Sequence, residues 1–533
     1  MGDTTIEIFG GLNVIGGNKI CITASNDAAV LLDFGLDFSI NKKFTDSFLK
    51  LREKEFVLDG LFVGLLPKPS GTLVNLYRKD LMLHCKNNLL EAFGIDYTPE
   101  AMPIVTDVAI SHVHTDHMGL IRYIHGSINL VLGTISDALL DHFTIVNKAT
   151  SLLRDVKAYK SFFKLVGGKI VVDDDETTRN VTKLDNGQST DVANGGINIQ
   201  FFETDHSVPG AGGFLLQDKE SGKKIVYTGD IRVHGPLGAK AQAFIAAAKE
   251  FEPDVLIIEG TRLARKGEES YYDDEESVKN KIFEILDDIN KTNDNALVLF
   301  ECSLRDVWRF KSFYEAACMA GRKLVVDADI YLLIAACQKA GVPEVSSIDL
   351  NNVLIYLFKA GSFSYANKDY SYNPEIVAAF TDPNIKLKAG AGKYNALNFK
   401  MHEHVKAEDI RNDPGKYVMY LSFYSLNELP DLRPPQGSHY IKSMSEPFDD
   451  EAAIDDQKRL NWLEAAGIPE ENRHQVHCSG HADPETIKSI ITTIAPRVVI
   501  PVHTEHPEMF LEMGLPATID VKLLETGEKF VIP

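Results

Sequence analysis

Apolar residues form two different patterns along the chain, and the pattern changes near residue 262. Before this point, residues 5–38 hold short apolar runs separated by glycine pairs, which predicts β-rich structure. Similar strand-like runs follow at 108–110, 196–201, 224–227 and 255–258. Beyond 262, apolar runs such as 296–300 alternate with helix-like segments, which favours a parallel sheet built from βαβ units.

Two helices are expected from local sequence. Residues 138–166 predict one helix, and four basic side chains would lie along one side of it: Arg154, Lys157, Lys160 and Lys164. Exposed Lys and Arg are common on a solvated helix face, so that explanation is simpler than RNA binding, although both stay open. Asp483 and Pro484 start a second helix, and apolar residues at i, i+3, i+4 and i+7 predict its buried face.

Composition predicts a globular protein of two to four domains. The chain has 533 residues, of which 44% are hydrophobic and 25% are charged. No apolar run reaches the length of about 18 residues that a transmembrane helix needs. The six cysteines are far apart and the N-terminus lacks a secretory pattern, so we expect a cytoplasmic protein without a membrane partner.

The formal net charge of −21 argues against nucleic acid as the substrate, because phosphate backbones attract Lys and Arg. However, a local basic groove can exist on an acidic protein, and bound metal ions add positive charge at the site itself.

Candidate chemistry is densest at residues 111–117, directly after the apolar run 108–110. His112, His114, Asp116 and His117 supply three imidazoles and a carboxylate, a combination that suits Zn²⁺ and similar cations. A histidine pair with one residue between its members projects to one side of an extended chain. We therefore predict a metal-binding loop.

Three further candidates follow apolar, strand-like runs: His206, Asp230 and His503. Each is a weak signal alone, because a lone histidine at a strand end is more often an ordinary hydrogen-bonded residue. Two ions about 3.5–4 Å apart, however, need ligands on both and usually a bridging carboxylate. The repeated arrangement of a strand followed by a ligand predicts a site at one edge of a β-scaffold.

The order of these residues, with Asp33 before them, resembles the metallo-β-lactamase superfamily. This resemblance implies an α/β fold, a four-layer αββα sandwich with a dinuclear site at its edge. It implies that His112, His114 and His206 hold one ion, that Asp116, His117 and a further histidine (His503) hold the other, and that Asp230 lies between them. Asp33 would orient the ligands and their loop.

Later motifs resemble the β-CASP branch, and the His-x-Ser-Gly-His sequence at 477–481 is especially similar to the ribonuclease J family. Glu259, His481 and His503 would be the three β-CASP motifs. The resemblance implies a lactamase domain at 1–261, with an insertion at about 40–104, and an inserted parallel-sheet α/β cap domain at 262–465. Residues 466–533 would complete the lactamase domain.

The resemblance also suggests roles. A water held between two metal ions, beside Asp230, would attack phosphorus. His481 is the candidate general acid, with Glu259 able to orient it. His477 and Ser479 are candidate phosphate ligands, although a structural loop role for His477 stays open. In this branch a histidine at the third motif accompanies RNA-processing members, so His503 points to RNA.

The cap departs from the ribonuclease J pattern at 300–309. Ser303 and Arg309 are the nearest equivalents of its phosphate-binding residues, but their spacing differs, which leaves recognition of a 5′-monophosphate open. The long segment 40–104 would form either a lid or a wall of the substrate channel, or a structural appendage. A homodimer is left open.

We interpret the chain as a metal-dependent phosphodiester hydrolase, a ribonuclease acting on single-stranded RNA, as exonuclease or endonuclease. Its cofactors would be two divalent ions, Zn²⁺ first, with Mn²⁺ also compatible with the ligands. One alternative is a small-molecule hydrolase on the same scaffold, such as a lactonase or phosphodiesterase. The other is a non-catalytic RNA-binding subunit, which the complete ligand set disfavours.

Overall fold

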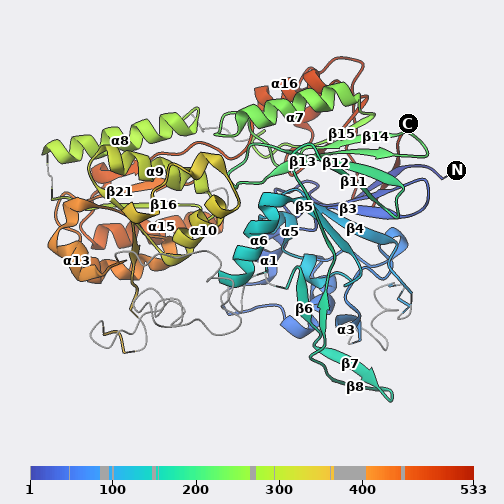
Figure 1. The fold of residues 1–533 in the computed structure, drawn as a ribbon, viewed down its shortest axis with the longest axis horizontal. Helices are drawn as coiled ribbons and strands as arrows, with labels where there is room; N and C mark the ends of the chain where they lie inside the picture. The colour runs from blue at the N-terminus through green and yellow to red at the C-terminus, as the bar shows by residue number, and fades with distance from the viewer. Residues whose placement is uncertain are drawn as a thin grey trace.

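The structure is a computed structural model. It describes residues 2–46, 48–83, 95, 97–98, 101–146, 152–153, 155–263, 272–292, 295–359, 362–364, 404–445 and 450–533. The described residues form three seven-stranded sheets and two short two-stranded ones. Two of the large sheets belong to the half of the molecule that holds both termini, and the third forms the other half (Figure 1).

The first sheet has the strand order β10-β5-β4-β3-β2-β1-β25. Its strands are β1 (Thr5–Gly10), β2 (Lys19–Thr23), β3 (Ala29–Leu32), β4 (Val105–Ile110), β5 (Asn129–Gly133), β10 (Val181–Leu184) and β25 (Lys529–Val531). The second sheet has the order β11-β12-β13-β14-β15-β23-β24. Its strands are β11 (Ser189–Val192), β12 (Ile197–Glu203), β13 (Gly212–Asp218), β14 (Lys224–Tyr227), β15 (Val255–Glu259), β23 (Val498–Val502) and β24 (Asp520–Val521).

The two sheets pack face to face, because each has apolar residues on both faces. Val30 and Leu32 lie in one buried cluster with Phe201 and Ile257 of the opposite sheet. The intervening Leu31 points the other way, as the two-residue period of a strand requires.

Helices cover both outer faces of this sandwich. The outer face of the second sheet packs against α7 (Gly238–Phe251) and α16 (Pro484–Ile494), and that of the first against α6 (Thr134–Val146). This is the expected four-layer αββα arrangement.

The third sheet is entirely parallel, with the order β19-β18-β17-β20-β16-β21-β22. We call residues 272–475 that build it and its helices the cap. Its strands are β16 (Val298–Cys302), β17 (Lys323–Val326), β18 (Val353–Tyr356), β19 (His404–Val405), β20 (Tyr417–Tyr420), β21 (His439–Ser443) and β22 (Arg473–Gln475). Because β22 pairs with β21, the sheet extends past the expected boundary at residue 465.

Helices lie on both faces of the cap sheet. One face packs against α8 (Glu275–Thr292), α9 (Val307–Met319) and α10 (Ala328–Lys339). The other packs against α13 (Ala407–Asn412), α14 (Leu429–Leu432) and α15 (Asp450–Ala465). The alternation predicted beyond residue 262 is therefore confirmed as a parallel α/β unit.

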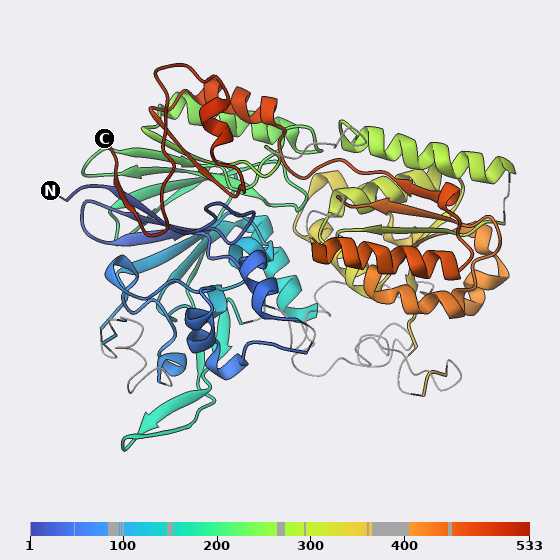
Figure 2. The same cartoon turned by 180° about the vertical axis from the view of Figure 1, so that it is seen from behind.

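The predicted helix at 138–166 is wrong beyond α6. After it come β6 (Ala158–Lys160), β7 (Phe163–Val166), β8 (Lys169–Val172) and β9 (Glu176–Thr178). Gly167 and Gly168 both have positive φ and form the turn between β7 and β8, a hairpin that projects from the body of the molecule (Figures 1 and 2). The proposed basic helix face does not exist: Lys157 pairs with Asp137 and Lys164 with Asp173, while Arg154 lies outside the described residues.

The described part of segment 40–104 packs into the molecule. It contains α2 (Phe56–Phe62) and α3 (Lys79–Met82), preceded by α1 (Phe38–Phe44). Leu61, Leu73 and Tyr77 are buried in the same core as the outer face of the first sheet. This part therefore contributes to that core; residues 84–94, 96 and 99–100 lie outside the described residues.

The helix predicted near the C-terminus is confirmed as α16. The Asp483 side chain accepts a hydrogen bond from the Thr486 backbone N–H, and the four isoleucines of the stripe, Ile487, Ile490, Ile491 and Ile494, are buried. Strand β23 follows, and His503 comes directly after its last residue, Val502. Among the described helices, none has the length and apolar content that crossing a bilayer requires.

Candidate metal centre

The seven predicted ligands come together at one edge of the sandwich. His112 and His114 follow β4, and Asp116 and His117 lie in the short helix α5 (Thr115–Met118). The other three ligands follow strands of the second sheet: His206 after β12, Asp230 after β14 and His503 after β23. Both sheets therefore contribute to the site.

Three groups of possible ligands share Asp230; one of them contains Glu259 and His481, and the other two contain the seven predicted ligands. The first set contains His112, His114, His206 and Asp230, and the second contains Asp116, His117, Asp230 and His503. His112 Nε2 and His206 Nε2 lie 3.7 and 3.6 Å from Asp230 Oδ2. On the other side, His117 Nε2 lies 3.2 Å from Asp230 Oδ2, and His503 Nε2 lies 3.6 Å from Asp230 Oδ1.

These separations fit metal coordination. Four ligand atoms around a tetrahedral zinc ion, each about 2.1 Å from it, would be about 3.4 Å apart. Two buried atoms of the cluster, His117 Nε2 and Asp230 Oδ1, also have no hydrogen-bond partner of acceptable geometry. Buried polar atoms seldom stay unsatisfied, so the donor set and its orphaned atoms fit divalent cations.

The two ligand sets differ in electrostatics. Burial, with neighbouring histidines, holds the pKa of His112 well below its ordinary value and lowers that of His206 to about 4. Burial also opposes protonation of His117, but Asp230, Asp116 and Asp33 together raise its pKa well above the ordinary value. The first set thus presents neutral imidazoles, while a cation in the second would displace a proton.

Asp33 supports the metal loop from beneath. Its Oδ1 accepts the Ser111 backbone N–H at 2.7 Å, and its Oδ2 accepts the hydroxyls of Ser111 and Tyr227, each at 2.7 Å. His117 Nδ1 lies 2.8 Å from Oδ2, so its proton belongs there and Nε2 is left to bind a cation.

Two other ligand histidines are oriented in the same way. His206 Nδ1 donates to the Gly480 carbonyl oxygen at 2.7 Å. His503 Nδ1 lies 2.9 Å from Thr261 Oγ1, whose proton goes to Glu259 at 2.5 Å. Each bond fixes the ring so that Nε2 faces the centre.

Gly35 allows the close approach of α5 to β3. A Cβ atom at this position would lie 1.5 Å from the Asp116 carbonyl oxygen, a backbone atom that cannot move independently. Glycine is therefore required here for Asp116 and His117 to reach the centre.

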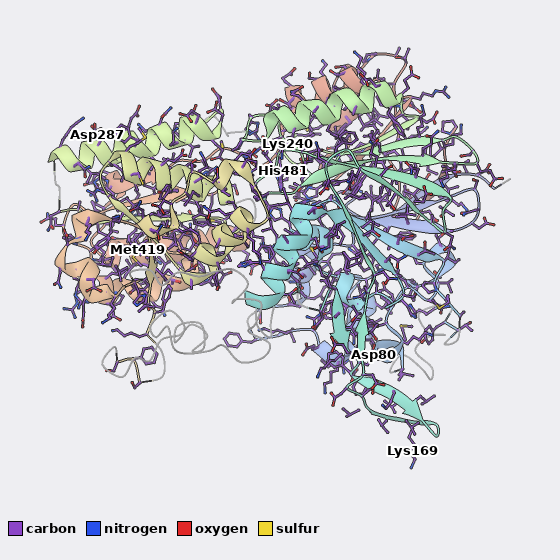
Figure 3. All side chains as sticks on the ribbon, viewed as in Figure 1. Asp80, Lys169, Lys240, Asp287, Met419 and His481 are labelled. Atoms are coloured by element: carbon purple, nitrogen blue, oxygen red, sulfur yellow. The ribbon has the colours of Figure 1, made fainter. Side chains whose placement is uncertain are left out.

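His481 stands on the open side of the centre, where the cap meets the sandwich (Figure 3). Its Nδ1 lies 3.0 and 2.9 Å from the two Glu259 carboxylate oxygens and 4.0 Å from Asp230 Oδ2. Its side chain is 20% exposed, whereas Glu259 and Asp230 are buried. The Glu259 contact leaves Nε2 of His481 as the atom available to a ligand.

The structure brings Ser479 to the same turn. Its hydroxyl oxygen accepts the His481 backbone N–H at 3.1 Å, and its carbonyl oxygen accepts bonds from Arg232 and His234. Ser479 therefore shapes the turn that carries His481. Ser303 lies exposed after β16.

Arg309 does not have the place that its spacing suggested. It is fully buried, and its guanidinium donates to Glu275, Ser443, His477 and Cys478. His477 Nδ1 accepts one of these bonds at 2.9 Å. Because its donors are used within the protein, Arg309 cannot bind substrate directly; instead it positions the 477–479 segment.

Sequence reasoning missed three residues that join the cap or the interior to the centre. Trp308 donates its indole N–H to the His206 carbonyl oxygen at 2.7 Å. Arg305 donates to Thr115 Oγ1 at 3.0 Å, and Arg232 is buried against Asp205. Their partners are far away in the sequence, so no local pattern could have identified them.

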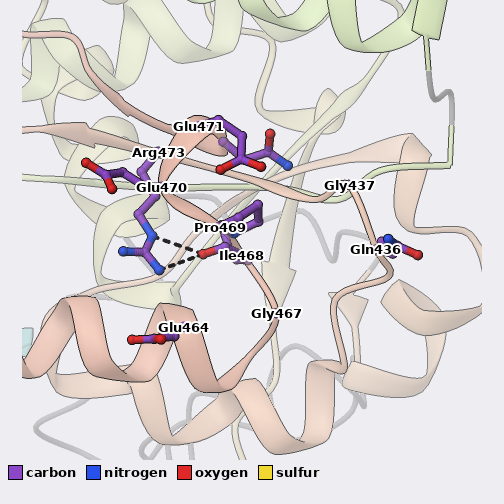
Figure 4. A pocket seen from close by; sticks show the side chains of 10 residues that line it. Gln436, Gly437, Glu464, Gly467, Ile468, Pro469, Glu470, Glu471 and Arg473 are labelled. Atoms are coloured by element: carbon purple, nitrogen blue, oxygen red, sulfur yellow. Dashed lines mark hydrogen bonds between the residues drawn. The ribbon is translucent and has the colours of Figure 1, made fainter.

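The cap carries a separate pocket between the end of α15 and β22 (Figure 4). Glu464, Glu470 and Glu471 line it, and the Arg473 guanidinium donates to the Ile468 carbonyl oxygen. It contains none of the predicted site residues, so we assign it no part in the chemistry.

Comparisons with known proteins agree with this geometry. Residues 470–510 match the family described as the Zn-dependent metallo-hydrolase RNA specificity domain. Ribonuclease J 1 of Streptococcus pyogenes serotype M3 is 21% identical over 456 residues, which cover 82% of this chain and 67% of that protein.

Two solved structures are also similar. The crystal structure of a protein of unknown function from Enterococcus faecalis V583 is 22% identical, covers 99% of this chain and 100% of that one, and has a TM-score of 0.64. This similarity shows the fold. The metallo-β-lactamase fold protein YhfI from Bacillus subtilis covers 52% of this chain and 80% of that one at 15% identity, with a TM-score of 0.26, too low to support an inference.

The four-layer scaffold, the parallel-sheet cap and the shared ligand sets therefore agree with the sequence matches. The chain thus has a metallo-β-lactamase-like fold with a cap, and its sequence is similar to the β-CASP protein Ribonuclease J 1 and to the RNA specificity domain of Zn-dependent metallo-hydrolases.

Proposed function

We propose that the protein is a metal-dependent hydrolase that cleaves phosphodiester bonds in single-stranded RNA. The observation that carries this proposal is the pair of ligand sets on Asp230 with the His481–Glu259 pair beside them. Its RNA specificity is supported by the family matched at 470–510 and by the similarity to Ribonuclease J 1.

In this proposal His112, His114 and His206 would hold one divalent cation, and Asp116, His117 and His503 would hold another, with Asp230 available to both sets. Zn²⁺ suits the histidine-rich set, and Mn²⁺ is also compatible. When bound, such ions make a water molecule more acidic and place positive charge against phosphate oxygens.

The protein's own groups supply the rest. His481 gives a proton to the departing oxygen from Nε2, while Glu259 holds Nδ1 and keeps the ring in place. Ser479 fixes the turn beneath His481, and Arg309 holds His477 beside it. The centre thus combines an oriented acid with a rigid set of cation ligands.

One observation favours a second candidate, a small-molecule phosphodiesterase or lactonase. Arg309, the residue expected to hold an RNA phosphate, is buried and fully engaged. The net charge of −21 points the same way. The cap argues against a small-molecule substrate, because its Arg305 and Trp308 contact the metal loops.

Cleavage of labelled single-stranded RNA, with and without a chelator, tests the proposal. We expect cleavage that the chelator abolishes. If RNA stays intact while a small ester or phosphodiester is hydrolysed rapidly, the second candidate is correct.

Replacement of His481 by Ala separates acid catalysis from metal binding. We expect turnover to fall by about 10²- to 10⁴-fold, the usual contribution of a positioned acid, with bound metal unchanged. His506→Ala is the matched control, because His506 is exposed and pairs with Glu508. Loss of metal from the His481 variant would instead make His481 a ligand.

A further inference from the structure

Arg305 reaches from the cap to the metal loop. It lies between β16 and α9, and its Nη1 donates to Thr115 Oγ1 at 3.0 Å, with the Val113 carbonyl oxygen 3.5 Å away. Thr115 stands between the ligands His114 and Asp116. The guanidinium therefore lies against the loop that carries four of the seven ligands.

Its charge is not neutralised by a carboxylate, as that of several buried arginines is. Arg78, Arg232, Arg309 and Arg459 each have a carboxylate oxygen within 3.2 Å. Buried Arg179 also has no carboxylate partner, but its guanidinium donates to three backbone carbonyl oxygens. Across the described ranges, no carboxylate oxygen lies within the 4 Å of an ion pair to Arg305, and its Nε and Nη2 donate no hydrogen bond. A cation that is partly buried without a counterion is costly, so an anionic ligand is the natural partner.

The surroundings of Arg305 fit such a ligand. Its guanidinium lies over the Phe143 ring, 5.1 Å from the centroid, which supports the planar group from one side. Burial lowers its pKa to about 10, partly opposed by Asp116, so it stays charged at neutral pH.

We propose that Arg305 binds a phosphate group of the substrate adjacent to the one that is cleaved. The inference rests on the proposed action on RNA and adds a specificity residue to it. The planar fork of unused N–H groups suits a phosphate, and a neutral ester offers nothing to bind it. Arg305 thereby takes the role that buried Arg309 cannot.

A bracing role is the alternative: Arg305 would only tie the cap to Thr115. Salt dependence separates the two, because each phosphate contact on a single strand contributes about 0.7 to the slope of log K against log salt. The test measures binding of a short single-stranded RNA to metal-loaded protein in the His481→Ala background, over a range of salt concentrations.

With Arg305→Gln, we expect binding about 10- to 100-fold weaker at low salt and a slope smaller by about 0.7. Arg305→Lys should keep the slope and lose part of the affinity, because it keeps the charge without the fork. Arg497→Gln is the control: Arg497 is exposed at the opposite end of β23 from His503 and should change neither quantity.

An unchanged slope in Arg305→Gln overturns the inference and leaves a brace. If Arg305→Gln does not fold or loses metal, the Arg305→Lys variant decides. A slope of log K against log salt that is smaller by about 0.7 in Arg305→Lys than in the wild type would contradict the inference. Failure of the proposed function looks different, because the wild-type protein would then neither bind nor cleave RNA.

Discussion

Asp33 shows how a single residue sets the geometry of the centre without belonging to either ligand set. Four donors converge on its carboxylate: the Ser111 N–H and hydroxyl, the Tyr227 hydroxyl and His117 Nδ1. Its backbone has φ of +59°, in the left-handed region that Asp and Asn tolerate better than most residues.

Asp33→Asn therefore tests orientation with the backbone conformation retained. The NH₂ group of the introduced asparagine cannot accept hydrogen bonds from the donors that surround the Asp33 carboxylate. His117 Nδ1 would therefore lose its acceptor, and its ring would tilt. We expect metal affinity to fall about 10- to 100-fold, as is usual for such supporting residues, measured by competition with a chromophoric chelator. Tyr227→Phe removes one donor and should have a smaller effect; equal affinity in Asp33→Asn and wild type would refute the role.

The sequence pattern identifies some functional residues of the centre and not others. The 111–117 ligands are close together in the chain, and His206, Asp230 and His503 each end a strand-like run, so their meeting could be predicted. Arg305 and Trp308 carry no such pattern, because their partners Thr115 and His206 are more than a hundred residues away. The burial of Arg309 depends likewise on Glu275 and Ser443.

At the scale of elements, a buried ionic network connects the cap helices to the turn before His481. Glu275 at the start of α8 pairs with Arg309 of α9 and with Arg232, and it accepts from the Cys478 thiol. Burial disfavours the Glu275 carboxylate, yet Arg309 and Arg232 lower its pKa below the ordinary value of 4.5.

This network predicts a pH dependence of stability. Because the folded-state pKa of Glu275 is lowered, its stabilising contribution is present above about pH 4.5 and is lost as the pH falls through the lower folded value. Glu275→Gln should lower the free energy of unfolding by about 3–5 kcal/mol at pH 7, because two buried arginines lose their partner. The deficit should shrink on acidification.

Denaturant unfolding of metal-free protein at pH 7 and below pH 4.5 measures both effects. Glu284→Gln is a suitable control, because Glu284 lies on the same helix and forms an exposed pair with Lys281. A deficit that stays constant with pH would show that the Glu275 charge does not matter.

Elements were predictable where periodicity was strong. The stripe of α16 and the strand β23 have clear patterns and are present as expected. The helix expected over 138–166 is present only as α6, and the segment after it forms strands up to the Gly167–Gly168 turn. The hairpin forms because those two glycines adopt positive φ between the paired strands β7 and β8.

At the scale of the whole molecule, the centre is where all parts meet. Four ligands come from the first sheet's loop and three from the second sheet, and the cap contacts both groups through Thr115 and His206. The parallel cap sheet could be expected from the alternation of runs, and the four layers from the resemblance to the metallo-β-lactamase superfamily. The exact extent of the cap sheet could not be expected, because β22 pairs with β21, from which α15 separates it in the sequence.

The most direct test locates the ions. Anomalous diffraction from crystals grown with Zn²⁺, measured on both sides of the zinc edge, should show two ions per chain, both contacting Asp230. One should lie among His112, His114 and His206, and the other among Asp116, His117 and His503. A zinc-loaded chain whose ions lie elsewhere, or with His206 or His503 turned away from them, would contradict the proposed centre and the hydrolysis that depends on it.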